Sequence, residues 1–115
     1  MTNNSEALKH AKKIAALNDA LRMHGTGGRI MLTSGIQALG QAAVNEILNK
    51  VRTFSAFTKD NDPHQEHDFA SINVGGNKVF FKIDYYDANL QYASPDPADA
   101  SKTCRVMTIL LADEY

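Results

Sequence analysis

Two strand-like segments joined by a pair of glycines constrain the fold of this chain more than any other feature. Residues 69–74 and 78–86 place apolar side chains at alternate positions, as strands with one buried face do. Gly75-Gly76 between them suits a two-residue turn in which both residues have positive φ. A turn of this length fixes which residues stand opposite each other, so the sequence predicts the register of a β-hairpin.

The predicted register gives the hairpin one apolar face. Ile72 stands opposite Val79 and Ala70 opposite Phe81, and cross-strand pairs of this kind stabilise a sheet. We expect this face to pack on helices. Its members are Ala70, Ile72, Val74, Val79, Phe81, Ile83 and Tyr85.

The other face of the hairpin is mixed in character. If pairing continues beyond the first strand, His67 stands opposite Asp84 with about 5 Å between their Cβ atoms. A carboxylate at that distance would orient the imidazole ring. The mixed face consists of His67, Phe69, Phe80, Lys82, Asp84 and Tyr86, and it is also suited to contact between two copies of the chain.

Helical spacing of apolar residues predicts two helices, over residues 5–23 and 41–54. On the first, Leu8 belongs to the expected apolar stripe, and Arg22 belongs to the expected polar face. Asn3 and Glu6 have the spacing of a capping pair, and we expect residues 1–4 to be flexible.

Two further strands are expected, over residues 29–33 and 105–112. The second is apolar on both faces, which predicts a central strand covered on both sides. The order helix-strand-helix-strand-strand-strand predicts an α+β fold: one small domain over residues 1–115, with a mostly antiparallel sheet of about four strands covered by two helices.

The composition excludes several classes of protein. There is no run of about 18 apolar residues that would cross a membrane, and the start lacks the pattern of a secretory signal. Cys104 is the single cysteine, in an apolar stretch, so we expect a structural thiol and a reducing cytoplasm. The formal net charge of −1 does not indicate a nucleic-acid binder.

The net charge hides an asymmetry between the two halves of the chain. Residues 1–52 carry seven Lys and Arg and three Asp and Glu, which gives +4; residues 53–115 carry five and ten, which gives −5. A basic partner would be drawn to the second half, although solvated loops would give the same pattern. Nucleic-acid binding through Lys9, Lys12, Lys13 and Arg22 on the first helix is the less favoured alternative.

The segment Asp60-Asn61-Asp62-Pro63-His64-Gln65-Glu66-His67-Asp68 concentrates titratable side chains more than any other. Together with Asp84, it offers ligands for a divalent metal such as Zn²⁺ or Mn²⁺: His64, His67, Asp68 and Asp84. No other cofactor is expected. The same groups suit acid–base chemistry, with His67 as base and Asp84 as its orienting group. Two other interpretations stay open: an ordinary turn around Asp62-Pro63, and an epitope for a partner.

A second candidate surface follows the hairpin. Tyr85, Tyr86, Asp87 and Tyr92 stand beside a proline-containing loop, and tyrosine and aspartate on a rigid turn suit protein contact. A tyrosine that caps the sheet edge is the structural alternative. The candidate partner-binding residues from both surfaces are Asp60, Asp62, Glu66, Lys82, Tyr86, Asp87, Tyr92 and Asp96.

Five segments carry a family resemblance: LNDALRMHGTGGRIMLTSGI, FTKDNDPHQEHDF, KIDYYD, SPDPADASKT and RVMTILLADEY. From about Leu17 to Tyr115 the chain resembles a bacterial family known as domain of unknown function 3768. The resemblance brings no catalytic assignment. It implies alphaproteobacterial genomes and plasmids, among accessory genes of mobile elements, and interference with a host defence system is one role that this setting implies.

Two functions are expected from these observations. The favoured one is a small cytoplasmic accessory protein that is not an enzyme and acts by binding a protein partner. The alternative is a metal-dependent or acid–base hydrolase centred on His64, His67, Asp68 and Asp84.

Overall fold

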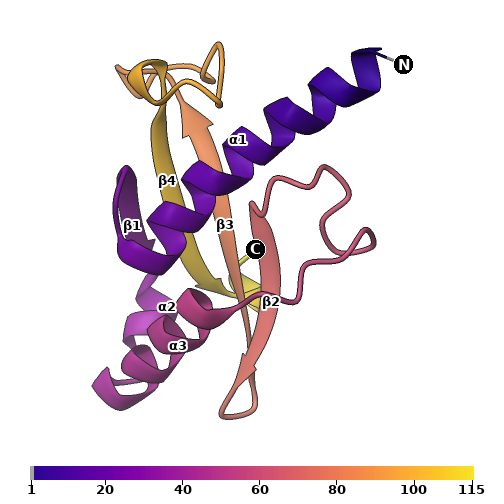
Figure 1. The fold of residues 1–115 in the computed structure, drawn as a ribbon. Coiled ribbons are helices and arrows are strands. Elements are labelled where there is room, and N and C mark those ends of the chain that lie inside the picture. Colours follow the sequence, from indigo (N-terminus) through magenta and orange to yellow (C-terminus); the bar gives the residue numbers. More distant parts are fainter. Residues whose placement is uncertain (1) are drawn as a thin grey trace.

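The chain forms a four-stranded sheet with its helices on one side, as the computed structural model shows (Figure 1). The structure describes residues 2–115, with side chains from Ser5 onward. The helices are α1 (Thr2–His24), α2 (Ser34–Gln37) and α3 (Gln41–Thr53), with single 3-10 turns η1 (Ala100–Lys102) and η2 (Ala112–Glu114). The strands are β1 (Gly28–Leu32), β2 (Phe69–Val74), β3 (Asn77–Tyr86) and β4 (Cys104–Leu111).

The strands lie in the order β1-β4-β3-β2. β1 runs parallel to β4, and the other two pairs are antiparallel. The sequence-based expectation of an α+β fold with a mostly antiparallel sheet is therefore confirmed. No helix within residues 2–115 has the length and apolar character needed to cross a membrane.

The hairpin has the predicted register. Phe69 pairs with Lys82, Ile72 with Val79, and the other partners follow in step. Gly75 and Gly76 have φ values of 55° and 80°, a region that residues other than glycine adopt at a cost. The turn geometry that these two glycines permit thus sets the pairing of both strands.

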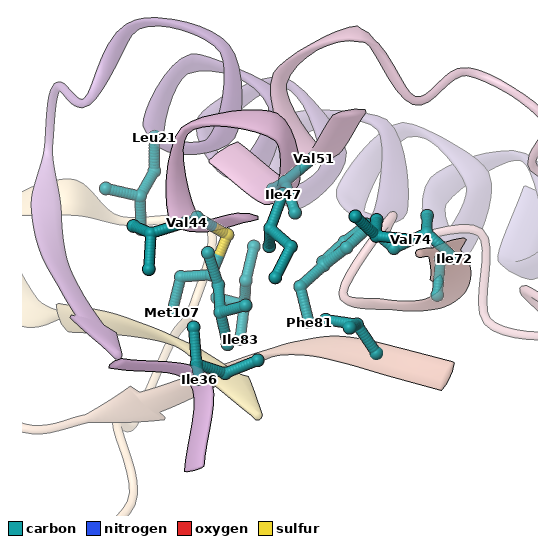
Figure 2. Close-up of a cluster of buried hydrophobic side chains, with 13 residues drawn as sticks. Leu21, Ile36, Val44, Ile47, Val51, Ile72, Val74, Phe81, Ile83 and Met107 are labelled. Atoms are coloured by element: carbon teal, nitrogen blue, oxygen red, sulfur yellow. The ribbon is translucent and has the colours of Figure 1, made fainter. Parts of the chain in front are cut away.

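The apolar face of the sheet packs on all three helices (Figure 2). Leu21 of α1, Ile36 of α2 and Ile47 of α3 meet Phe81 and other side chains of the hairpin and β4 in one cluster. The prediction for this face of the hairpin is confirmed. Burial of each large aliphatic side chain in such a cluster contributes on the order of 1.5–3 kcal/mol.

The opposite side of the sheet carries no α-helix of the described chain. We call this side the open face. It consists of the strand side chains that alternate with the core residues: Arg29, Met31, Phe69, Ser71, Asn73, Lys78, Phe80, Lys82, Asp84, Tyr86, Cys104, Val106, Thr108 and Leu110. β4 is central, as predicted, and none of its side chains is exposed. The helices cover one of its faces, and on the open face its side chains lie beside those of β1 and β3.

α1 contacts the rest of the molecule through polar as well as apolar side chains. Asn18 is fully buried and Arg22 is only 3% exposed, so the prediction of a solvated Arg22 is wrong. Leu8 is exposed, because the first turns of α1 extend beyond the sheet (Figure 1). Apolar spacing alone does not reveal where a helix leaves its support. The proposed Asn3–Glu6 cap involves a side chain outside the described residues.

Arg22 closes the carboxyl end of α3. Its Nη1 donates to the carbonyls of Val51 (3.0 Å), Arg52 (3.3 Å) and Phe54 (2.8 Å), and its Nη2 donates to Asp19 (2.8 Å). The last carbonyls of a helix lack partners within the helix and carry partial negative charge. The guanidinium therefore satisfies several of them at once and fixes α1 against α3.

We predict that Arg22→Met destabilises the fold by about 3 kcal/mol, since it leaves buried carbonyls and Asp19 without their donor. Urea unfolding would show a lower midpoint with an unchanged slope. The control is Arg52→Met, which removes an exposed arginine from the same region and should change stability by less than about 0.5 kcal/mol. Equal effects of the two substitutions would contradict a capping role.

Candidate functional site

The segment from Asp60 to Asp68, which we call the titratable segment, passes around the β2 edge of the sheet. Some of its side chains lie on the α1 side and others at the open face. Gln65 and His67 have φ values of 58° and 56°, a region that residues other than glycine seldom adopt. These residues break the strand alternation, because the paired ladder begins only at Phe69. His67 is thereby turned toward α1, whereas Asp68 lies beside β3, where its carbonyl accepts from the N–H of Ile83.

His67 is held between two carboxylates on the α1 side. Its Nδ1 donates to Asp19 at 3.0 Å, its Nε2 lies 3.8 Å from Asp62 Oδ2, and its ring stacks on Phe57 with 4.1 Å between centroids. The expected pairing of His67 with Asp84 is therefore wrong. His67 leaves the strand because its backbone has a positive φ and its ring bonds to the carboxylate of Asp19.

Asp62 and Glu66 bond to other parts of the chain. Asp62 is 4% exposed and accepts a hydrogen bond from the backbone N–H of His67. Glu66 accepts from the hydroxyl of Tyr85, which in turn accepts from Asn18. Burial, more than the neighbouring Glu66, raises the pKa of Tyr85 far above its ordinary value, so this hydroxyl keeps its proton. Both carboxylates thus help to fix the segment on the body of the protein.

Three of the four predicted metal ligands line a cleft at the edge of the open face. His64, Asp68 and Asp84 surround a cleft of about 370 Å³ together with Lys82 and Tyr115. The ammonium of Lys82 lies 2.7 Å from Asp84, and this hydrogen bond raises the pKa of Lys82. We call this cavity the His64 cleft.

The carboxyl group of Asp68 is the one in the His64 cleft that is best suited to proton transfer. Partial burial raises its pKa above the ordinary value, and the nearby charge of Glu66 raises it further. A carboxyl that retains its proton more readily than usual is suited to donate one. The direction of this pKa shift, together with the position of Asp68 in the cleft, suits this carboxyl group to proton transfer.

Metal binding has less geometric support. His67 lies on the other side of the segment from the three residues of the His64 cleft. Among the described residues, no three His, Cys, Asp or Glu side chains are grouped closely enough to hold an ion. The structure therefore does not bring the four predicted ligands together, and metal binding by them stays a prediction.

The loop after β3 presents the second predicted surface. Asp87 accepts from the backbone N–H groups of Asn89 (3.2 Å) and Gln91 (3.0 Å), and its own N–H donates to the Tyr92 carbonyl (2.7 Å). Tyr86 and Ala93 form a further bridge. We call residues 87–93 the anchor loop, because these bonds hold its backbone while Tyr92 remains exposed to solvent.

The remaining predicted partner-binding residues are dispersed. Asp60 is exposed at the tip of the titratable segment, whereas Asp96 Oδ1 lies 2.9 Å from Nε2 of His10 on α1. The hydrogen bond from His10 lowers the pKa of Asp96. Lys82 belongs to the open face, and Tyr86 lies at the end of that face where the anchor loop begins.

Three residues that contact the titratable segment were not predicted from the sequence: Asn18, Asp19 and Phe57. The sequence does contain an indication that Asn18 is buried, because Asn18 lies one helical turn from both Ile14 and Leu21 in the apolar stripe of α1. Polar residues in an apolar stripe often bond to buried partners. No local pattern indicates that Asp19 and Phe57 would meet at His67.

We predict that Asp68→Asn raises the free energy of unfolding at neutral pH. The pKa of Asp68 is raised in the folded state, so its contribution to stability is full below the ordinary value of 3.8 and falls as pH rises through the folded pKa. The asparagine variant avoids that loss. Urea unfolding from acidic to neutral pH should show the two proteins diverging as pH rises; a gap independent of pH would point to altered packing instead.

The comparisons with known proteins identify a family. The sequence profile described as Protein of unknown function (DUF3768) matches residues 32–114, from the end of β1 to η2. The match begins later than the resemblance suggested, so all of α1 lies outside it. Comparisons with curated proteins and with solved structures gave no match. Since the matched range covers well over half of the sequence, the chain belongs to the DUF3768 family of proteins of unknown function.

Proposed function

We propose that this protein acts by binding a protein partner through the anchor loop. The observation that carries the proposal is that Tyr92 is 74% exposed on a loop whose backbone is held by hydrogen bonds at Asp87. Leu90, with φ of 58°, is exposed on the same loop. Exposed apolar and aromatic side chains on a fixed loop suit a binding function.

The rigidity of the anchor loop favours affinity. Ordering a mobile loop on binding costs free energy, which a loop already fixed by Asp87 largely avoids. Tyrosine also gives a large contact area with few rotatable bonds. Tyr92 is therefore the residue that we expect to contribute most to binding.

The charge of the chain supports a partner with a basic surface. Residues 53–115, which include the anchor loop, carry five basic and ten acidic residues. Complementary charge speeds association and disfavours wrong partners. It contributes less than Tyr92 to the final affinity, because exposed charges are screened by salt.

The biological setting that we propose is the bacterial cytoplasm. Membership of the DUF3768 family supports it through the resemblance to proteins that accompany mobile elements. In that setting the protein would bind a host protein and interfere with it. The candidate partner is a component of a host defence system. A small domain that binds without catalysis suffices for such a role.

We predict that replacing both Leu90 and Tyr92 with alanine reduces partner capture by about tenfold or more, as expected when contact residues contributing about 1–2 kcal/mol are lost. Tagged proteins would retain partners from a bacterial lysate, quantified by mass spectrometry. Met23→Ala is the control, because Met23 is an exposed apolar residue on α1, away from the anchor loop. Proteins retained equally by all three forms would argue against the anchor loop.

Acid–base hydrolysis in the His64 cleft is a second candidate function. The raised pKa of Asp68 favours it, since Asp68 would donate a proton to a leaving group while His64 accepts one from water. His67 takes no part, because it lies on the α1 side.

We predict that this second function would be observed as hydrolysis of an unactivated alkyl ester such as ethyl acetate, whose alkoxide leaving group needs a proton. His64→Gln and Asp68→Asn should each lower the rate by about 10²–10⁴-fold. The control is His10→Gln, which alters an exposed histidine on α1. A rate no higher than that of buffer, or one equally lowered by the control, would reject hydrolysis at this cleft.

A further inference from the structure

The open face is more apolar than the solvent-facing side of an antiparallel sheet normally is. Such sheets usually alternate apolar residues toward the core with polar residues toward water. Here Phe80, Val106 and Leu110 point away from the helices, and Met31 lies on the same face. Met31 is 54% exposed and Phe80 and Val106 are partly exposed, whereas Leu110 is buried. Apolar groups left on a surface indicate a contact with another molecule.

The chain itself covers only one end of the open face. Tyr115 packs on Phe69 and Phe80, with ring centroids 6.2 and 5.8 Å away, and Leu110 beside them is buried. Beyond this aromatic group, the open-face side chains of β4 (Cys104, Val106 and Thr108) are only partly buried. Because β4 has the apolar pattern of a strand covered on both sides, its second cover is expected from another chain.

The charges at the centre of the open face are arranged so that the face complements itself. Lys82 and Asp84 are two residues apart on β3, point the same way, and lie 2.7 Å apart at Nζ and Oδ2. Both side chains remain partly exposed. Two sheets can face each other across a two-fold axis that lies between them and runs perpendicular to their strands. Each strand then faces its own copy with the residue order reversed. Lys82 of one copy would then meet Asp84 of the other.

We propose that the open face binds a second copy of this chain, giving a symmetric dimer of two sheets packed face to face. Packed sheets lie about 10 Å apart, a spacing that apolar side chains such as Phe80 and Val106 fill from both sides. The two Lys82–Asp84 pairs form a group of four alternating charges at the axis. The anchor loop lies outside this contact, so the dimer holds or fails independently of partner binding through that loop, whereas the His64 cleft shares Lys82 and Asp84 with the contact.

The open face is at the small end of the size range for a dimer. The four strands have 5, 6, 10 and 8 residues, and at about 3.4 Å per residue and ~4.8 Å between strands they span about 470 Å². Side chains enlarge the buried surface beyond this flat area, toward the roughly 800 Å² per partner found in stable interfaces. A second copy is favoured over an unrelated protein because the central charged pair is its own complement.

The test is a charge exchange measured by sedimentation equilibrium. Wild-type protein should have twice the 12.6 kDa monomer mass. Lys82→Glu and Asp84→Lys should each weaken self-association by about a hundredfold, because like charges then meet across the axis. An equimolar mixture of the two variants should recover the dimer mass, because two acidic side chains of one copy then face two lysines of the other.

Two further variants decide the result. Lys13→Glu reverses an exposed lysine on α1, on the other side of the sheet from the open face, and should leave the dimer unchanged. Met31→Lys places a charge on an exposed part of the open face and should weaken the dimer without unfolding the chain, as circular dichroism would show. Monomeric wild-type protein, dimers of undiminished strength in the open-face variants, or equal weakening by Lys13→Glu would overturn the proposal.

Discussion

The guanidinium of Arg22 connects three parts of the molecule that are distant in sequence. It belongs to α1, it caps the end of α3, and through Asp19 it borders the site of His67. It also lies over the rings of Phe57 and Phe81, with 5.3 and 5.8 Å between Cζ and the ring centroids. The position of the titratable segment therefore depends on Arg22 as well as on the bonds of Glu66 to Asn18 and Tyr85, because Arg22 holds α1 where the segment meets it.

Buried polar groups on α1 give the helix a single position on the sheet. Apolar contact alone is non-directional and would tolerate some sliding. Asn18 instead bonds Arg105 and Tyr85, and Arg105 also donates to the carbonyl of Pro97. Burial lowers the pKa of Arg105, which reflects the cost of removing a guanidinium from water. The hydrogen bonds of Arg105 offset part of that cost, and they also fix its orientation.

The parts of the fold that were predicted correctly are those controlled by local pattern. The register of β2 and β3 followed from Gly75-Gly76, and the helix-facing side followed from alternation. The site was predicted only in part. His64, Asp68 and Asp84 do share a cleft, but His67 leaves it because its left-handed backbone and its bond to Asp19 have no signature in the neighbouring sequence. The segment after β3 was predicted to be a loop from its composition, whereas its hydrogen bonds required the structure.

The position of β4 has a consequence for how the chain folds during synthesis. β4 lies between β1 and β3, although it follows both in sequence. β1 has no other neighbour in the sheet, so it stays unpaired until β4 has been synthesised. More than half of the chain leaves the ribosome between the two strands. Such long-range pairing slows folding and leaves apolar segments accessible to aggregation or to chaperones in the meantime. Ile30 and Met31 belong to β1, and we expect the nascent chain to be most prone to aggregation at these two residues.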